Sequence, residues 1–274
     1  MKRILLATFA ASLTMCAWSQ DSSKQQRPDT IRIGGMIIIR NGDKNDSSRN
    51  GTTITHAKRN RNANTNWWIV DLGFANVNDN TNYPNAVSSG FAAPGIGKEQ
   101  MKLRTGKSVN VNIWIFMQKL NVVKRVLNLK YGMGLELNNY RFDDRRIQFL
   151  ENPTKLVLNE DWKDFQKNKL AADYVTIPLM LNLNFTPGSS RSKSFGLSGG
   201  FSAGYLYSSR QKIKDGGDKD KTHDDFNLRK WKLAYIGELN LGLIKLYGSY
   251  ALKSMFESGL DQTPYNVGIR LSRF

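Results

Sequence analysis

Polar and apolar residues alternate along several segments of the chain with a period of two. Between positions 109 and 117 the sequence reads VNVNIWIFM, which places Val109, Val111, Ile113, Ile115 and Met117 on one face and Asn110, Asn112, Trp114 and Phe116 on the other. This is the side-chain period of a β-strand. Seven further segments repeat it, so the sequence predicts eight strands, at residues 67–75, 108–119, 127–142, 172–185, 195–209, 228–241, 244–256 and 265–274.

The second face of these segments carries Asn, Lys, Glu, Gly and Ser. A strand that is apolar toward lipid and polar toward a lumen is typical of a transmembrane β-barrel. The sheet must then close, because an open edge would leave backbone groups unpaired in lipid. We therefore expect an all-β fold, an eight-stranded antiparallel up-and-down barrel. Its lumen is narrow enough to be filled by side chains.

Long and short connections alternate along the chain. The long ones are residues 76–107, 143–171 and 210–227. Outer-membrane barrels have long external loops and short periplasmic turns, which predicts that both termini are periplasmic. Pro178 lies inside a predicted strand and cannot donate to the ladder, so we expect a bulge or weakened pairing there.

The first nineteen residues have the features of a secretory signal: Lys2 and Arg3, an apolar run at 4–11, and Ala-Trp-Ser before Gln20. Lipidation of Cys16 is the alternative, although Met15 is larger than a lipobox requires. Cleavage after Ser19 leaves no cysteine and hence no disulfide. Residues 20–66 form a predicted periplasmic extension, with a β-prone run at 30–40 and a polar linker at 41–66. Residues 67–274 form the predicted barrel domain.

Outside the signal, the sequence has no stretch of 18–20 apolar residues that would form a transmembrane helix. A secreted soluble β-protein is the competing interpretation. It explains the signal, but it does not explain why the apolar faces are so uniformly one-sided.

The chain carries a formal net charge of +17, which falls to +15 when Lys2 and Arg3 are removed with the signal. Nucleic acid is the usual partner of such a basic chain, but export argues against it. Outer-membrane lipid headgroups and lipopolysaccharide phosphates are the favoured partners. The alternative is that these charges are simply solvated in loops and linker.

Eight charged residues fall on the predicted inward face. They are Asp71, Lys130, Glu136, Lys232, Glu238, Lys245, Lys253 and Arg270. Both signs are present, and buried charges must be paired, so we expect a salt-bridged plug. A gated ion path or a ligand site is the alternative.

Aromatic residues near the predicted strand ends indicate interfacial girdles. They are Trp67, Trp68, Tyr140, Phe142, Tyr174, Phe185, Tyr205, Tyr207, Tyr250 and Tyr265.

The sequence contains no HExxH, CxxC or phosphate loop. His223 lies beside Asp224 and Asp225 in a charged loop, and His56 lies in the linker. DGGDKD at 215–220 lacks the spacing and closing Glu of a calcium loop. We predict no catalytic, metal-binding or cofactor-binding residue; an enzyme that edits lipid A is the alternative that would need one.

Several segments resemble the PorT-like outer-membrane β-barrel proteins of the Bacteroidota. These are DTIRIGGMIIIRNGD, WWIVDLGFAN, LKYGMGLELNNYRFDD, YVTIPLMLNLNF and LYGSYALKSMFESGLDQTPYNVGIRLSRF. The resemblance covers residues from about Thr30 to the end and implies an eight-stranded outer-membrane barrel. Some relatives belong to the type IX secretion and gliding apparatus, but no motif here carries that role. The alternation at the C-terminus departs from the family, because Arg273 takes an outward position and Phe274 is out of phase.

Three functions fit these patterns. The leading hypothesis is a non-enzymatic structural or interaction protein that acts through its external loops and a basic periplasmic arm at 40–61. Its partners would be outer-membrane lipid, the barrel assembly machinery during insertion, and an envelope or secretion protein. A narrow pore is the second hypothesis, and the lipid A-modifying enzyme is the third.

Overall fold

The computed structural model describes residues 30–33, 36–39, 53–56, 62–151 and 153–272. The predicted signal at 1–19, most of the basic arm at 40–61, Arg273 and Phe274 lie outside these residues. The chain divides into two units, 1–61 and 62–274.

The first unit contains a three-stranded antiparallel sheet in the order β1-β2-β3. The strands are β1 (Thr30–Ile33), β2 (Met36–Ile39) and β3 (Thr53–His56). The β-prone run at 30–40 supplies two of them. The third lies in the segment predicted as a linker, where Thr53, Ile54 and Thr55 are β-branched and suit a strand.

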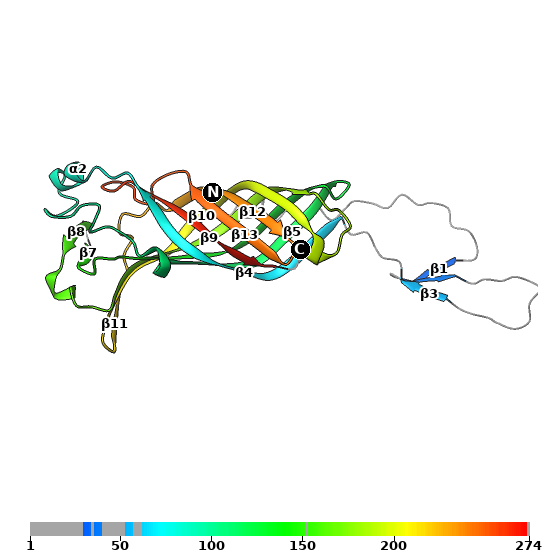
Figure 1. Cartoon of the computed structure of the whole chain (residues 1–274), viewed down its shortest axis with the longest axis horizontal. Helices are drawn as coiled ribbons and strands as arrows, with labels where there is room; N and C mark the ends of the chain where they lie inside the picture. The colour runs from blue at the N-terminus through cyan, green and yellow to red at the C-terminus, as the bar shows by residue number, and fades with distance from the viewer. Residues whose placement is uncertain (1–29, 34–35, 40–52, 57–61, 152, 273–274) are drawn as a thin grey trace, which may run out of the picture. The chain divides into compact units, whose positions relative to one another are not determined.

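The second unit is a closed ring of eight antiparallel strands, in which each strand pairs with its neighbours along the chain and the last pairs with the first (Figure 1). The strands are β4 (Ala63–Asp79), β5 (Val109–Val123), β6 (Leu127–Arg141), β9 (Lys167–Asn184), β10 (Phe195–Asp215), β12 (Trp231–Leu241), β13 (Ile244–Ala251) and β14 (Gln262–Leu271). The predicted eight-stranded up-and-down barrel is therefore confirmed.

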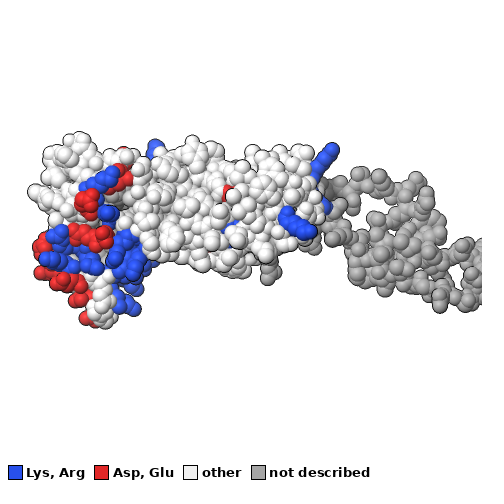
Figure 2. Space-filling model, in the orientation of Figure 1, with Lys and Arg blue, Asp and Glu red and all other residues white. Residues whose placement is uncertain are grey.

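The outer face of the ring is an apolar belt. On β9, Ile177, Leu179 and Leu181 are more than half exposed, whereas Pro178 and Met180 between them are buried. Most of the surface over the strands carries no charged side chain in Figure 2. Exposed aliphatic side chains on every second position are what a lipid-facing strand requires.

Pro178 weakens the ladder on one side only. The pairing of β6 with β9 runs to Tyr131↔Leu179 and resumes at Gly134↔Thr176. On the other side Pro178 pairs with Ser202 in unbroken register, and the bulge of that ladder lies further on, between Leu206 and Ser208. Of the two expected outcomes, the structure thus shows the weakened pairing, between β6 and β9, and no bulge at Pro178.

A bulge in β5 changes which residues face the lumen. The register with β6 shifts between Trp114 and Phe116. Beyond this point the alternation inverts: Met117 is 1% exposed, and Phe116 packs against the exposed Trp67, with ring centroids 5.9 Å apart. The prediction that Met117 faces outward and Phe116 inward is therefore wrong, because one extra residue reverses every side chain that follows.

The long loops fold together into a cap, defined here as residues 80–108, 142–166, 216–230 and 252–261. Its regular elements are α2 (Tyr83–Ser88), η2 (Thr105–Lys107), β7 (Ile147–Leu150), β8 (Lys155–Leu158), η3 (Glu160–Trp162) and β11 (Asp218–Thr222). In Figure 1, α2, β7, β8 and β11 gather at one end of the ring. The opposite end carries short turns, one of which contains η4 (Arg191–Lys193).

Phe149 lies at the centre of the core of the cap. Its ring packs against those of Phe142, Phe226 and Phe256, with centroids 5.6–6.1 Å apart. Gln211 of β10 accepts from the backbone N of Phe149 at 3.0 Å and donates to the carbonyl oxygen of Ile147 at 2.8 Å. The β7–β8 hairpin is thereby fixed to the barrel wall.

The predicted aromatic girdles are partly wrong. Tyr140, Phe142 and Tyr174 are 2–3% exposed and belong to the core that the cap shares with the adjoining strands. Trp67, Trp68, Phe185, Tyr205, Tyr207 and Tyr250 are exposed as expected. Tyr140, Phe142 and Tyr174 lie on the inner side, where no lipid reaches them.

Candidate functional site: a filled lumen beneath a folded cap

Two strands on opposite sides of the lumen form reciprocal ion pairs. Lys130 of β6 reaches Glu238 of β12, with Nζ 2.5 Å from Oε1, and Lys232 of β12 pairs with Glu136 of β6. β9 and β10 separate these strands in the ring, so both pairs cross the interior. In each strand the lysine precedes the glutamate by six residues; because the strands are antiparallel, each lysine lies opposite the glutamate of the other strand.

Arg270 of β14 joins a third carboxylate to this network. Its Nε and Nη2 donate to Asp71 at 2.8 and 2.7 Å, and its Nη1 donates to Glu238 at 2.5 Å. Asp71 also accepts from the indole nitrogen of Trp114 at 2.7 Å. This paired, bidentate geometry is what a buried guanidinium needs to offset its desolvation.

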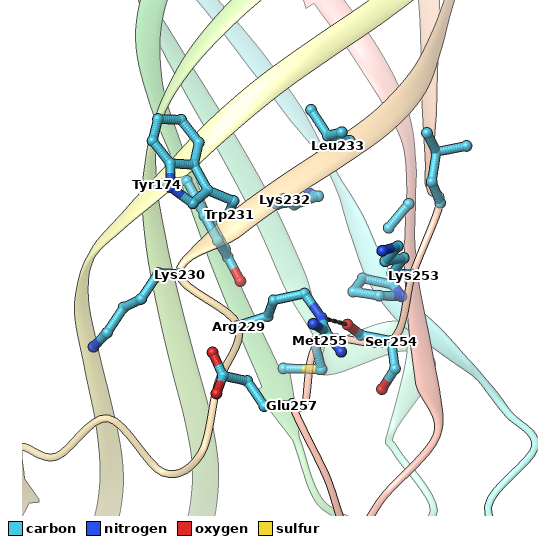
Figure 3. A pocket seen from close by; sticks show the side chains of 13 residues that line it. Tyr174, Arg229, Lys230, Trp231, Lys232, Leu233, Lys253, Ser254, Met255 and Glu257 are labelled. Atoms are coloured by element: carbon cyan, nitrogen blue, oxygen red, sulfur yellow. Dashed lines mark hydrogen bonds between the residues drawn. The ribbon is translucent and has the colours of Figure 1, made fainter.

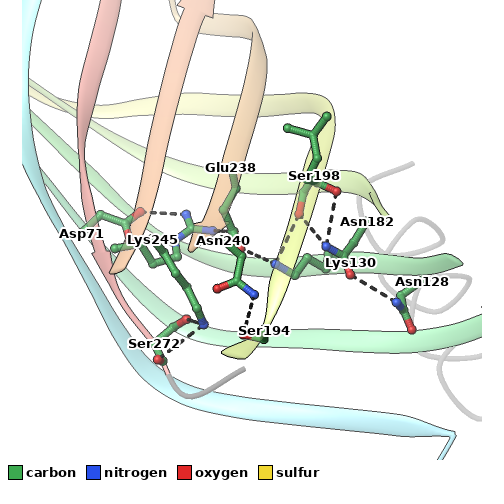
Figure 4. Close-up of polar contacts among 12 residues, drawn as sticks. Asp71, Asn128, Lys130, Asn182, Ser194, Ser198, Glu238, Asn240, Lys245 and Ser272 are labelled. Atoms are coloured by element: carbon green, nitrogen blue, oxygen red, sulfur yellow. Dashed lines mark hydrogen bonds and ion pairs between the residues drawn. The ribbon is translucent and has the colours of Figure 1, made fainter. Parts of the chain in front are cut away.

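Lys245 and several neutral side chains continue the network toward the short-turn end. Lys245 donates to the hydroxyl of Ser272 at 2.6 Å, and Asn182 donates to that of Ser198 at 3.0 Å. Figure 4 shows these contacts converging from several strands onto one interior space. Most polar side chains inside the ring therefore bond one another, although among the described residues the buried amide oxygens of Asn240 and Asn266 accept no hydrogen bond.

The structure places the seven residues Asp71, Lys130, Glu136, Lys232, Glu238, Lys245 and Arg270 in the lumen, each no more than 9% exposed. Four of them (Asp71, Lys130, Glu238 and Arg270) are linked by ion pairs, Glu136 and Lys232 form a separate ion pair, and Lys245 bonds Ser272. Lys253, which was expected beside them, is exposed. β13 ends at Ala251, so the alternation that predicted an inward Lys253 has already stopped.

The ring also encloses an apolar cluster that the sequence pattern did not predict. Ile69, Trp114, Met117 and Met180 are 1–5% exposed and pack together. Met117 was missed because of the bulge. The cavity that adjoins this cluster and the Arg270 network measures about 30 Å³, which is room for about two waters.

A second cavity of about 370 Å³ opens where β12 and β13 separate, on the loop side of the last paired residues Ala234 and Ala251 (Figure 3). Arg229 spans it and donates to the carbonyl oxygens of Ser254 and Phe256 at 3.3 and 3.2 Å. Four basic residues line this cavity against one acid, Glu257. Its character is thus basic and amphipathic.

Nothing in that cavity forms a catalytic constellation among the described residues. The hydroxyl of Ser254 donates to the carbonyl oxygen of Leu260 and accepts from the backbone N of Phe256 and Gln262. This hydroxyl therefore holds the loop together.

The described residues contain no group of three or more His, Cys, Asp or Glu placed to hold a metal ion. His223 is exposed in a shallow cavity beside Asp224 and Asp225, and the hydroxyl of Ser209 donates to the carbonyl oxygen of Asp224. His56 lies in β3 of the first unit. In the part of the chain that is described, no helix is long and apolar enough to cross a membrane.

A closed ring with an apolar outer belt and a polar, ion-paired interior defines a transmembrane β-barrel. The chain belongs to the outer membrane protein beta-barrel domain family, whose model matches residues 41–257. The match ends before β14, which completes the ring by pairing with β13 and β4. No individually curated protein matches the sequence.

Proposed function

We propose that this outer-membrane barrel is closed to solutes and acts as a structural and interaction protein, with the folded cap as its working surface. The observation that carries the proposal is the reciprocal pairing of β6 and β12 across the lumen. These ion pairs occupy the path that a solute would follow. The core of the cap, centred on Phe149, would block the same path at the loop end of the barrel.

The orientation is part of the proposal. Long loops of outer-membrane barrels face the exterior, and short turns face the periplasm. The cap then lies at the cell surface, and Asn62 and Ser272, at the two ends of the barrel unit, lie on the periplasmic side. The basic arm at 40–61 would in that case meet periplasmic partners or inner-leaflet headgroups.

A role beside a secretion or envelope complex is the finer part of the proposal. It is supported by the resemblance of WWIVDLGFAN, LKYGMGLELNNYRFDD and the C-terminal segments to PorT-like proteins. A non-enzymatic role is supported by the use of Ser254 in loop hydrogen bonds and by the exposure of His223.

Cysteine labelling in whole cells tests the orientation. Cys16 is the only cysteine in the sequence, so one introduced cysteine is unique in a chain cleaved after Ser19. Lys98→Cys, on an exposed position of the cap, is expected to react with a membrane-impermeant maleimide on intact cells. Ser189→Cys, in the turn between β9 and β10, is expected to react only after the outer membrane is permeabilised. The reverse pattern would reject the orientation.

A further inference from the structure

The strands β6, β9, β10 and β11 carry a row of basic residues at matching positions. Arg141 pairs in register with Lys169, Lys169 with Lys212, and Lys212 with Lys221. Neighbouring strands lie about 4.8 Å apart, so the row spans about 14 Å. Four cations thus stand side by side across four strands.

A second row lies two residues further toward the loop end. Lys167 pairs with Lys214, and Lys214 pairs with Lys219. These two rows together are called the cationic face. Like charges directly opposite each other destabilise a sheet, so the arrangement opposes folding and requires another explanation.

Acidic residues of the same hairpin lie on its opposite side. The sequence KIKDGGDKDK alternates, and the pairing places Asp215 opposite Asp218 and Ile213 opposite Asp220. Gln211, on that same side, is buried against the cap. The lysines therefore continue the outer surface of the barrel. The hairpin thus has lysines on its outer face and aspartates on its inner face.

The cationic face has almost no acidic partner. Arg210, two residues before Lys212 of the first row, pairs with Asp173 at 2.6 Å. Within the described part of the chain, no acidic side chain forms an ion pair with any of the seven residues of the two rows. Burial together with the neighbouring Lys167, Lys212 and Arg210 lowers the pKa of Lys169 to about 8, against the opposing effect of Asp173. The charges are therefore close enough to repel one another.

Directly below the cationic face the same strands become lipid-facing. Tyr207 is 48% exposed at the β10 bulge, and Arg210 follows three residues later. On β9, residues 175–185 carry apolar side chains at their outward positions. These eleven residues are enough to cross the bilayer core, which leaves Lys167 and Lys169 outside it. Figure 2 shows basic side chains gathered at the edge of the surface that carries no charge. A lysine here can lie at headgroup level with its alkyl stem against the belt.

We propose that the cationic face binds the phosphorylated headgroup of a membrane lipid that carries more than one phosphate. The two rows supply seven cations across about 14 Å, so they can contact phosphates that are not adjacent. Acyl chains of the same lipid would lie on the exposed Ile177 and Tyr205 below. The proposal rests on the proposed orientation, which places this face in the outer leaflet.

Native mass spectrometry of the full-length protein in a mild neutral detergent tests the binding. The probes are diphosphoryl, monophosphoryl and dephosphorylated lipid A at equal concentration. We expect the bound fraction to fall in that order. The triple variant K169A/K212A/K214A should lose at least tenfold in affinity for the diphosphoryl form.

The matched control is K98A/K102A/K163A, which removes the same charge from exposed cap positions outside the cationic face. It should bind within about twofold of the wild-type protein. Equal loss in both triples, or equal binding of all three lipids, would overturn the proposal. Heat-modifiable migration on gels verifies that each variant is folded. Because the experiment is done in detergent, it is independent of orientation, which the cysteine labelling tests separately.

Discussion

Lys130 and Glu238 lie on strands separated by two others in the ring, yet their charged atoms are 2.5 Å apart across the lumen. Glu136 and Lys232 repeat the pair in the reverse sense. The two contacts tie opposite walls of the barrel together. The side chains in the lumen therefore contribute to the stability of the barrel.

Breaking one of these pairs should destabilise the barrel strongly. In Lys232→Met the carboxylate of Glu136 stays buried with only amide and hydroxyl donors from Asn138, Asn266 and Thr176. Removing one partner of a buried pair costs about 3–5 kcal/mol. We expect a loss of that size in the free energy of unfolding in urea, measured in detergent or in bilayers.

The double variant Glu136→Gln/Lys232→Met should recover most of that loss, because no uncompensated charge remains. Lys253→Met is the control, since Lys253 is exposed. If the single and double variants are equally unstable, the ion pair is not the source of the effect.

The cap should open without loss of the barrel when its core is disrupted. Phe149→Ala removes the ring that contacts Phe142, Phe226 and Phe256. A Phe→Ala change in a core costs about 3–5 kcal/mol, and here the loss falls on the cap. We expect faster proteolysis within 142–166 and 216–230 and an unchanged heat-modifiable shift.

Phe185→Ala serves as the control for the cap, because Phe185 is 54% exposed on the outer face. Its cap should be cleaved at the wild-type rate. Global unfolding of Phe149→Ala, with loss of the heat-modifiable shift, would mean that cap and barrel are not separable.

Binding of phosphorylated lipid should weaken as the pH rises through about 8. The pKa of Lys169 is lowered to about 8 by burial and by Lys167, Lys212 and Arg210, while Asp173 acts in the opposite direction; Asn139 and Arg141 face it from β6. A lysine is charged below its pKa and neutral above it, so one cation of the row is lost in this window. The affinity for diphosphoryl lipid A, measured from pH 6.5 to 9.5, should fall with a midpoint near 8.

Lys169→Arg should flatten that profile, because arginine stays charged throughout the range. A wild-type profile without a step near pH 8, or an identical step in Lys169→Arg, would remove Lys169 from the binding site.

The eight-stranded ring could be predicted from the period-two alternation, because successive side chains of a membrane-spanning strand point alternately to lipid and to the lumen. The alternation also predicted the lumen charges, since in an unbroken strand it fixes the face of a residue. The prediction failed wherever the strand was interrupted. The bulge after Trp114 moved Met117 inside, and the end of β13 left Lys253 outside.

The cap could not be predicted in this way. Its core joins Phe149, Phe226 and Phe256 from three different loops, and no local period connects them. The cationic face depends on strand register, which sequence spacing alone leaves open. The six-residue spacing of lysine and glutamate in LKYGMGLE and WKLAYIGE was a signal in the sequence, and the pairing across the lumen explains it.

Single-channel recording tests the closed barrel most directly. The purified protein is inserted into planar bilayers, and insertion is verified by its heat-modifiable shift after recovery. With the paired charges in place and an adjoining cavity of only about 30 Å³, we expect no conductance steps. Stable, ohmic steps of uniform size at low voltage would contradict the filled lumen.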